Sequence, residues 1–432
     1  MSDINIIAVI VFCLFVLLFS GSWVFAALGI AGVLGIWLFG ANLRTALSLQ
    51  MWGTTNSFIL TAIPLFIFLG EIMLRSGIST SLYKGIMTWA GRFPGGLIHS
   101  NVMACALFAA ISGSSVATAA TMGTVAIPDQ MARGYDRKLI LGSITASGTL
   151  GILIPPSIVM IIYGSWMEVS IAQLFIGGLI PGVVLALLFM LYIAVKCSLQ
   201  PSLAPKVASS WRERALSIKD IWPSLVIILF IIVAIYTGLM TPTETAAVAA
   251  LVALIITVIV RRFSFELLYE CALNAVRTTA MLIIIVIGAK IFVMALIYLK
   301  LTLLLPALMA SLNMPPLMAL IFIYVVYLIL GCFFDSISLL LVTLPFVQPL
   351  LLLLGIDLIW FGIVVTVLLE IGLITPPVGM NLYVIMGITK DCSLSEITRA
   401  VTPFFLILLS GVVLLNVFPQ LALWLPSTMF GG

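Results

Sequence analysis

The chain has 432 residues, of which 63% are hydrophobic and only 8% are charged. A soluble domain carries about 25% charged residues, so this composition excludes a soluble globular protein and indicates an integral membrane protein surrounded by lipid. The net charge of +4 gives no indication of a nucleic-acid partner. The six cysteines lack metal-ligand spacing, and we expect them to be small buried hydrophobic residues.

Several uncharged runs exceed the ~20 residues that a spanning helix needs. These runs cover residues 4–43, 45–70, 93–128, 301–334 and 401–432. The alternating pattern of a membrane β-barrel is absent, so the sequence predicts an all-α polytopic protein. The N-terminus carries Asp3 and no basic segment before its apolar run, which is typical of a first span rather than a cleaved signal peptide.

The first half of the chain, residues 1–197, predicts five spans and one long interrupted segment. Spans are expected near 5–20, 22–40, 57–74, 138–166 and 172–195, with a more polar stretch at 42–56 and an amphipathic interfacial segment at 77–90. Residues 93–132 are either two full spans or a re-entrant hairpin, because Gly113-Ser114-Ser115 lies near the middle of that apolar run.

A polar loop at residues 198–219 divides the chain, and residues 220–432 repeat the plan of the first half. Spans are expected near 221–238, 244–260, 280–298, 358–388 and from 402 onward, with a mixed segment at 263–279 and an interfacial arm at 301–312. Residues 315–353 form the second long interrupted segment, with Asp335-Ser336 at its centre.

The positions of lysine and arginine predict the orientation of these ten spans. If both interrupted segments are hairpins that return to the side they entered from, 16 of the 19 basic residues face the cytoplasm and the N-terminus lies outside. The exceptions are Arg44, Lys300 and Lys290, which lies within a span. Two full spans return the chain to the side it started from, as a re-entrant hairpin does. Charge alone therefore does not distinguish one hairpin from two spans.

Two predicted spans are broken by paired prolines, at Pro155-Pro156 and Pro376-Pro377. Each proline removes a backbone donor and clashes with the preceding turn, so neither span is an unbroken helix. Because the bilayer interior has no water to satisfy the freed carbonyls, a break at that depth predicts a protein-lined cavity or a bound ion.

The spacing from Pro155 to Pro376, which we call the repeat offset, also relates other residues of the two halves. Pro94, Pro128, Gly134, Asp136, Gly151 and Ser115 have their counterparts at Pro315, Pro349, Gly355, Asp357, Gly372 and Ser336. With the predicted orientation the two halves are inverted repeats, and paired broken segments in inverted repeats indicate a secondary transporter with a midplane site. The alternative is that the prolines only kink structural helices.

Asp335 is the most isolated charge, with 34 uncharged residues before it and 21 after it. A carboxylate at the bilayer centre costs roughly 2.5–3.5 kcal/mol, so we expect it to bind an ion or substrate, to cap the next half-helix, or to do both. Hydroxyls and free carbonyls near Ser112–Ser115 suit Na⁺, and exposed N–H groups at half-helix starts suit a carboxylate. The predicted substrate contacts are Ser114, Ser115, Thr149, Asp335, Ser336 and Asn381. Glu370 and Lys290 are either partners or separate structural groups.

These motifs resemble the large membrane subunit of tripartite ATP-independent periplasmic (TRAP) transporters over nearly the whole chain. The resemblance is carried by Asn56-Ser57-Phe58-Ile59-Leu60, Ile63-Pro64, Gly70-Glu71-Ile72-Met73, Pro94-Gly95-Gly96-Leu97, residues 112–120, Gly134-Tyr135-Asp136, Ile154-Pro155-Pro156-Ser157, Tyr163-Gly164, Thr241-Pro242-Thr243-Glu244 and Thr375-Pro376-Pro377-Val378-Gly379.

The resemblance implies an elevator-type transporter of the bacterial inner membrane, which is not an enzyme. It implies two partner proteins, a four-helix small membrane subunit that is not fused to this chain and a periplasmic substrate-binding protein. It also implies two or more coupling Na⁺ ions, held by backbone carbonyls around Ser112, Gly151, Ile154 and Ser157, and around Gly331, Gly372, Thr375 and Val378. Gly331 lies slightly before the position that the repeat offset assigns to Gly113, which weakens the assignment in the second half.

The expected activity is Na⁺-coupled uptake of a small organic anion, such as sialic acid, a C4-dicarboxylate, another hydroxy or keto acid, or a sulfonate. The alternative within the same class is a stand-alone Na⁺/dicarboxylate symporter that needs no binding protein. An intramembrane hydrolase would need a serine with His99 or Lys290 as its base, and neither residue has a supporting motif. A purely structural membrane subunit is the remaining alternative.

Overall fold

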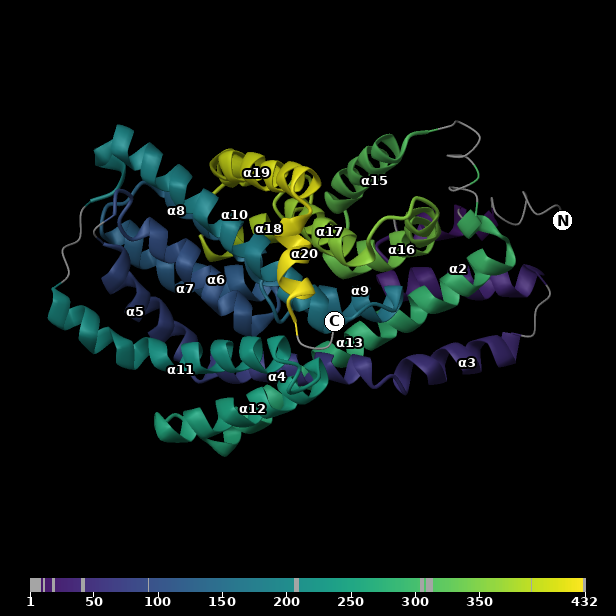
Figure 1. Ribbon diagram of the computed structural model, residues 1–432, viewed down its shortest axis with the longest axis horizontal. Helices are drawn as coiled ribbons and strands as arrows, with labels where there is room; N and C mark the ends of the chain where they lie inside the picture. Colours follow the sequence, from purple (N-terminus) through teal and green to yellow (C-terminus); the bar gives the residue numbers. More distant parts are fainter. Residues whose placement is uncertain are drawn as a thin grey trace.

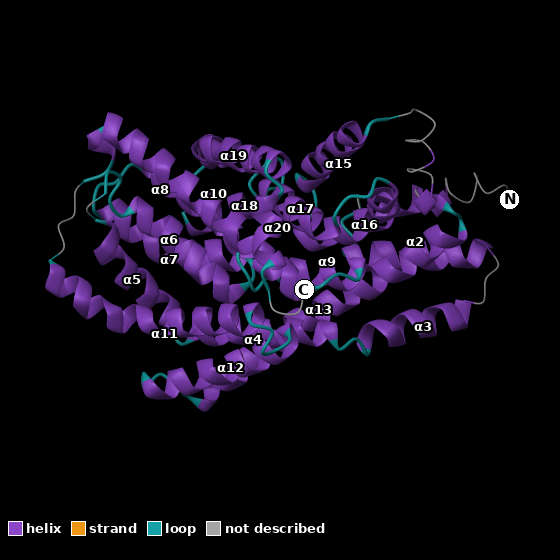
Figure 2. Cartoon of the chain, in the orientation of Figure 1, coloured by secondary structure: helices purple, strands orange, loops and turns teal. Residues whose placement is uncertain are grey.

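The computed structural model describes residues 9–10, 12–17, 20–39, 43–91, 93–205, 210–303, 307, 314–389 and 391–429. Within this part of the chain every regular element is a helix and no strand is present (Figure 2). The all-α prediction is therefore confirmed.

The helices pack in two groups (Figure 1). In the first, the 34-residue α13 packs against α2, α3 and α4, while α11 packs against α5 and α12. We call this set the α13 group. Its bounds are α2 Val24–Phe39, α3 Leu43–Thr55, α4 Ala62–Arg75, α5 Ile78–Ala90, α11 Trp211–Tyr236, α12 Pro242–Ile259 and α13 Phe265–Tyr298.

The second set, which we call the core group, contains both proline breaks. Here α8 packs against α6, α7 and α19, and α17 packs against α15, α19 and α10. Its bounds are α6 Ile98–Ser112, α7 Ser115–Ala132, α8 Arg137–Thr149, α9 Ile158–Met167, α10 Ile171–Leu199, α15 Pro316–Gly331, α16 Ser336–Leu353, α17 Leu358–Leu373, α18 Met380–Ile388, α19 Leu394–Val417 and α20 Gln420–Ser427. Short 3₁₀ helices are η1 Ile59–Thr61, η2 Leu150–Ile152, η3 Pro201–Leu203 and η4 Leu301–Leu303.

The helix bounds follow the same repeat offset that the sequence shows. Helices α7 and α16 both have 18 residues, and their first residues, Ser115 and Ser336, are counterparts at that offset. Asp136 and Asp357 cap α8 and α17 in the same way, each accepting a hydrogen bond from the backbone N–H three residues later. The duplication is thus present in the local structure as well as in the sequence.

The structure shows several elements that the sequence did not predict. Residues 43–55 of the polar stretch form α3, which bends by 53° into α4. The mixed segment at 263–279 and the span at 280–298 are one continuous helix, α13, because Ser264 caps its start and no helix breaker interrupts it. The loop at 198–219 is shorter than predicted, because α10 continues to Leu199 and α11 begins at Trp211 behind a Ser210–Glu213 capping box.

Among the described residues, six helices are long and apolar enough to cross a membrane: α10, α11, α12, α13, α16 and α19. The bent α3–α4 pair makes a seventh, and five shorter apolar helices include α6, α9, α15 and α17. The count of ten spans stays a prediction, because the first predicted span is only partly described. Most of the predicted arm at 301–312 also lies outside the described residues.

Candidate functional site: two helix breaks, each faced by a hairpin tip

The two interrupted segments are helical hairpins. Helices α6 and α7 pack against each other and are joined by Gly113 and Ser114 alone, whereas α15 and α16 are joined by residues 332–335. In Figure 1 the α6–α7 hairpin lies to the left of the centre and the α15–α16 hairpin to the right. At 15 residues, α6 is only about 22 Å long, which is less than a ~30 Å hydrocarbon core. The length of α6 therefore favours a re-entrant hairpin over two full spans.

The tip of the first hairpin contacts the first break directly. Ser115 Oγ donates a hydrogen bond to the Thr149 carbonyl at 2.9 Å, just where α8 ends. A Cβ atom on Gly151 would lie 2.8 Å from the backbone of Ser114, so only glycine allows this approach. The predicted residues Ser114, Ser115, Thr149 and Gly151 are thus brought together.

The remaining predicted residues of the first half surround the same contact. Ser112 Oγ lies 2.8 Å from Thr118 Oγ1, and Ser114 caps α7 by accepting from Ala117 N at 3.4 Å. Ser157 caps α9 and is fully buried, accepting from Met160 N at 3.3 Å. Among the described residues, the Ile154 carbonyl oxygen accepts no hydrogen bond.

The second hairpin meets the second break through a different set of atoms. A Cβ atom on Gly372 would lie 2.8 Å from the Cα and carbonyl oxygen of Gly331, and Val378 N donates to the Cys332 carbonyl at 3.0 Å. Gly331 therefore takes the place that Ser114 and Ser115 take in the first half. Gly331 lies before the position that the repeat offset assigns to Gly113 because α15 ends earlier and its connection to α16 is longer than that between α6 and α7.

Asp335 caps α16, as one of the sequence alternatives predicted. Its Oδ2 atom accepts from the backbone N–H groups of Ile337 at 3.1 Å and Ser338 at 3.0 Å. Thr375 Oγ1 donates to the Ile371 carbonyl at 2.6 Å. Within the described chain, the Thr375 carbonyl oxygen accepts no hydrogen bond, like that of Ile154 at the matching position.

Asn381 joins the two halves. Its Nδ2 donates to the Thr145 carbonyl of α8 at 3.3 Å, and its side chain is fully buried. It thus ties α18 to α8 in this structure, and its predicted contact with substrate stays a prediction. Asn381 Oδ1 and Ser336 Oγ have no hydrogen-bond partner in the part of the chain that the structure describes, so both can accept a ligand.

Glu370 and Lys290 are not partners. Glu370 is fully buried in α17, and neither carboxyl oxygen has a hydrogen-bond partner among the described residues. Among the described residues, no ion pair includes Lys290. The alternative that paired these two residues was therefore wrong.

Sequence reasoning missed a buried polar cluster at the base of the first hairpin. Tyr83, Asn101, Gln130 and Ser143 are all fully buried and hydrogen-bonded to one another. In the sequence Asn101 follows His99-Ser100 and Gln130 follows Asp129, so their polar neighbours give no local signal that these two amides are buried.

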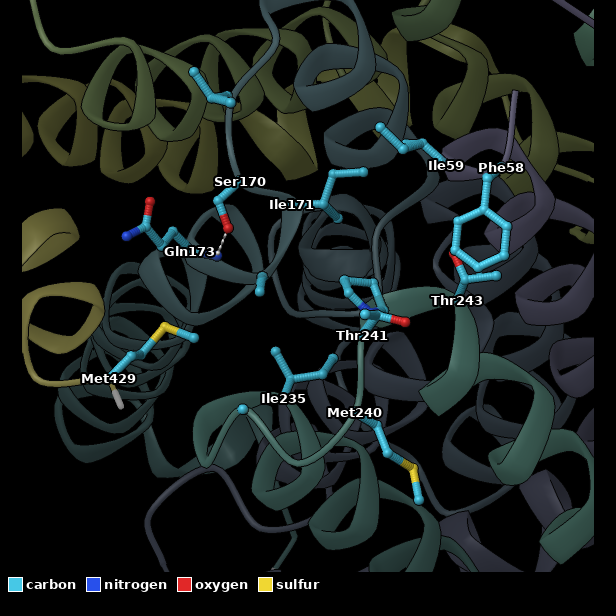
Figure 3. Close-up of a pocket in the computed structure, with 14 residues that line it drawn as sticks. Phe58, Ile59, Ser170, Ile171, Gln173, Ile235, Met240, Thr241, Thr243 and Met429 are labelled. Carbon is cyan, nitrogen blue, oxygen red and sulfur yellow. Dashed lines mark hydrogen bonds between the residues drawn. The ribbon is translucent and has the colours of Figure 1, made fainter. Parts of the chain in front are cut away.

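A cavity of about 440 Å³ lies away from both breaks (Figure 3). It is formed by η1, the α9–α10 turn and the α11–α12 turn. At the α9–α10 turn, Ser170 Oγ accepts a hydrogen bond from Gln173 N at 3.3 Å. None of its lining residues is charged, and none is a predicted site residue. It therefore provides no charge that would select an organic anion.

The fold and this site define a polytopic helical membrane protein with two broken helices, each closed by a hairpin tip. The family described as "Tripartite ATP-independent periplasmic transporter, DctM component" matches residues 11–421. The chain belongs to this family.

Named relatives are similar over nearly their whole length. The C4-dicarboxylate TRAP transporter large permease protein DctM of Pseudomonas aeruginosa is 36% identical over 93% of this chain and 94% of its own. The sialic acid TRAP transporter large permease protein SiaM of Vibrio cholerae is 34% identical over 88% and 89%. A solved structure, the Alcanivorax borkumensis YdaH transporter, has a TM-score of 0.66 at 18% identity and 89% coverage of both chains, which supports the fold alone.

Proposed function

We propose that this chain is the permease of a Na⁺-coupled system that takes up a small organic anion across the bacterial inner membrane. A periplasmic binding protein delivers the anion, and a small membrane subunit accompanies the chain. The observation that carries the proposal is the pair of breaks in register, each with a free carbonyl at the matching residues Ile154 and Thr375. Unwound carbonyls in broken membrane helices are the ligands that secondary transporters use for Na⁺.

The residues proposed to hold Na⁺ are those around Ser112, Gly151, Ile154 and Ser157, with Gly331, Gly372, Thr375 and Val378 in the second half. Each set combines backbone carbonyls with hydroxyl side chains, which are hard oxygen donors suited to a hard cation. The substrate would lie between the tips, where the N-terminal ends of α7 and α16 present backbone N–H groups to an anion. Ser114, Ser115, Thr149, Asp335, Ser336 and Asn381 are its proposed contacts.

The substrate class follows from charge and from the relatives. Both named permeases transport carboxylates according to their descriptions, a C4-dicarboxylate and sialic acid. Moving one charge across 100 mV is worth about 2.3 kcal/mol, so two Na⁺ ions supply about 4.6 kcal/mol and outweigh one inward monoanion. A carboxylate or sulfonate is therefore the proposed cargo.

In the proposed elevator mechanism the core group, together with α5, which Gln130 of α7 binds through Tyr83, moves against the rest of the α13 group. The two halves are proposed to be inverted repeats, with the first hairpin open to the cytoplasm and the second to the periplasm. The hairpins lie on opposite sides of the core in Figure 1, which supports this arrangement.

A comparison of NaCl with KCl tests the Na⁺ sites. We expect the melting temperature of the purified chain to rise with NaCl concentration and not with KCl, because a ligand that binds only the folded state stabilises it by RT ln(1 + [L]/Kd). Equal melting curves in both salts would count against Na⁺ binding. Uptake of succinate and sialic acid into proteoliposomes then tests the cargo class, and uptake without any binding protein would favour a stand-alone symporter.

A further inference from the structure

The two hairpins are held by different kinds of contact, although they match in sequence register. In the first hairpin, Gln130 of α7 donates to Tyr83 Oη at 2.9 Å and to Asn101 Oδ1 at 2.6 Å. Asn101 of α6 in turn donates to Ser143 Oγ of α8 at 2.9 Å. Four helices, α5, α6, α7 and α8, are therefore joined at the base of the first hairpin by directional hydrogen bonds between buried side chains.

The second hairpin has apolar residues at the matching positions. At the repeat offset, Asn101, Gln130 and Ser143 correspond to Phe322, Leu351 and Val364. The contacts of these three are non-directional, so they tolerate a small displacement of one helix against another far better than a hydrogen-bond network does. The base of the second hairpin is thus held by packing alone at these positions.

The outer helices of the two hairpins also differ in burial. Twelve of the 15 residues of α6 are buried, but only six of the 16 residues of α15 are. The outward face of α15 presents Leu317, Ile321 and Ile329, which are suited to lipid chains. Fluid lipid does not fix the position of α15 as packed protein fixes α6.

The space within the second hairpin is incompletely filled. A cavity of about 290 Å³ lies between α15 and α16, lined by apolar side chains that include Phe322, Val326 and Phe346. Its polar contact is the hydrogen bond from Thr343 Oγ1 to Tyr327 Oη at 2.6 Å, which stays inside the hairpin. The cavity is open on one side, where Phe322 is 45% exposed, so the neighbouring side chains leave room for α15 to shift.

The side-chain hydrogen bonds of the two tips also favour a more firmly held first hairpin. Ser115 Oγ donates to the Thr149 carbonyl across the first contact, whereas its counterpart Ser336 Oγ has no partner among the described residues. The second hairpin reaches neighbouring segments through the backbone bond from Val378 N to the Cys332 carbonyl and through Tyr324 Oη to Asn416 Oδ1 at 3.0 Å.

We propose that the α15–α16 hairpin opens to exchange ions and substrate, and that the α6–α7 hairpin stays fixed to α5 and α8. The proposal rests on the transport function proposed above, and it adds which of the two hairpins is the gate. Opening breaks the Gly331–Gly372 approach and the bond from Val378 to Cys332, while the contact between Ser115 and Thr149 persists.

Amide hydrogen exchange of the full chain in lipid nanodiscs tests this. Residues 108–120 and 329–341 cover the two tips at matching positions. After correction for intrinsic rates, we expect the second segment to exchange at least about tenfold faster, because its opening costs at least about 1.4 kcal/mol less. Equal exchange, or faster exchange at residues 108–120, would overturn the proposal.

A substitution tests whether the polar cluster is the cause. Gln130→Leu gives the first hairpin the residue type found at Leu351, and we expect exchange at residues 108–120 to rise about tenfold while 329–341 is unchanged. Gln420→Leu, at an exposed position of α20, is the matched control. If Gln130→Leu leaves exchange at 108–120 unchanged, the cluster does not hold the hairpin and this explanation fails.

The salt used in the same experiment separates this proposal from the transport function. NaCl should slow exchange at residues 329–341 relative to KCl, because bound Na⁺ closes the gate on its break. If the two tips differ but neither responds to Na⁺, the gate assignment holds and Na⁺ coupling fails. If both respond to Na⁺ and exchange equally, Na⁺ coupling holds and the gate assignment is overturned.

Discussion

Gly151 and Gly372 lack a Cβ atom, and the tertiary contacts show why this matters. Each allows the backbone of a hairpin tip to approach a helix end to a distance that a Cβ atom would block. Neither has a positive φ, so the requirement is for space and not for an unusual backbone conformation. The repeat identified both positions in the sequence, but it contained no measure of how close the approach is.

We expect Gly151→Ala and Gly372→Ala each to displace a tip and to weaken Na⁺ binding about tenfold or more. Gly387→Ala in α18 is the matched control, because a Cβ atom there meets no other atom within 4 Å. The melting temperature measured against NaCl concentration is the test. Unchanged Na⁺ stabilisation in the Gly151 and Gly372 variants would show that close approach at the breaks is not needed for Na⁺ binding.

Asp335 has a cap role that can be separated from its charge. Asp335→Asn keeps a side-chain oxygen for the N–H groups of Ile337 and Ser338, so we expect the melting temperature without Na⁺ to change little. Asp335→Ala should lower the free energy of unfolding by about 1 kcal/mol, as the loss of a cap does. If the negative charge assists a cation, both variants weaken Na⁺ stabilisation, and a normal Na⁺ response in Asp335→Asn would restrict Asp335 to capping.

At the scale of elements, the two breaks share one design. In each, a helix that is capped at its start (α8 or α17) ends against the tip of a hairpin. A proline pair then prevents helical hydrogen bonding, and a short helix (α9 or α18) follows. Prolines lack an N–H group, so the carbonyls before them have no donor within their own helix. Sequence reasoning located both breaks for this reason, and it offered a cap role for Asp335. The caps at Asp136, Ser157 and Asp357 were found only in the structure.

Restoring helical continuity should impair the site without preventing membrane insertion. Pro155→Ala with Pro156→Ala supplies two N–H donors, and we expect carbonyls proposed to face Na⁺ to be drawn into helical hydrogen bonds. The double variant should reach the membrane in normal amounts and lose Na⁺-dependent stabilisation. Pro181→Ala in α10, a helix that continues through its proline, is the control. A normal Na⁺ response in the double variant would contradict this account of the break.

At the scale of the whole molecule, the charges predict which turns face each side of the membrane. The α10–α11 connection is flanked by Lys196, Arg212 and Arg214, whereas the α11–α12 turn at residues 237–241 carries no charge. The positive-inside rule therefore places the first in the cytoplasm and the second outside. The uncharged cavity in Figure 3 is bordered by the same α11–α12 turn, so it would open to the outside.

Thiol labelling of intact cells tests this orientation. Leu239→Cys, at a position 74% exposed, should react with a membrane-impermeant maleimide added from outside. Ser202→Cys, an exposed residue of η3, should react only after the cells are permeabilised. Native cysteines set the background, which the unsubstituted chain measures. The reverse labelling pattern would show that the orientation of the whole chain is opposite to the predicted one.

The sequence by itself determined the class of protein, the duplication and the positions of both breaks. These features depend on local chemistry: an apolar run must be helical in lipid, and paired prolines must interrupt a helix wherever they occur. The family was also evident, because the motifs that carry the resemblance are short and contiguous. The length of α13 and the helical state of residues 43–55 were missed, since in both stretches packing against neighbouring helices overrides a mixed local composition.

Only the tertiary structure decided how the two halves differ. The pairing of Ser115 with Thr149, of Gly331 with Gly372, and of Asn381 with Thr145 joins residues far apart in the chain, which no local pattern specifies. The polar cluster around Gln130 and the apolar residues at the matching positions are both visible in the sequence, yet neither has meaning until the helices are packed. Contacts at equivalent sequence positions therefore differ in strength, because the energy of a contact depends on which residue the fold places opposite it.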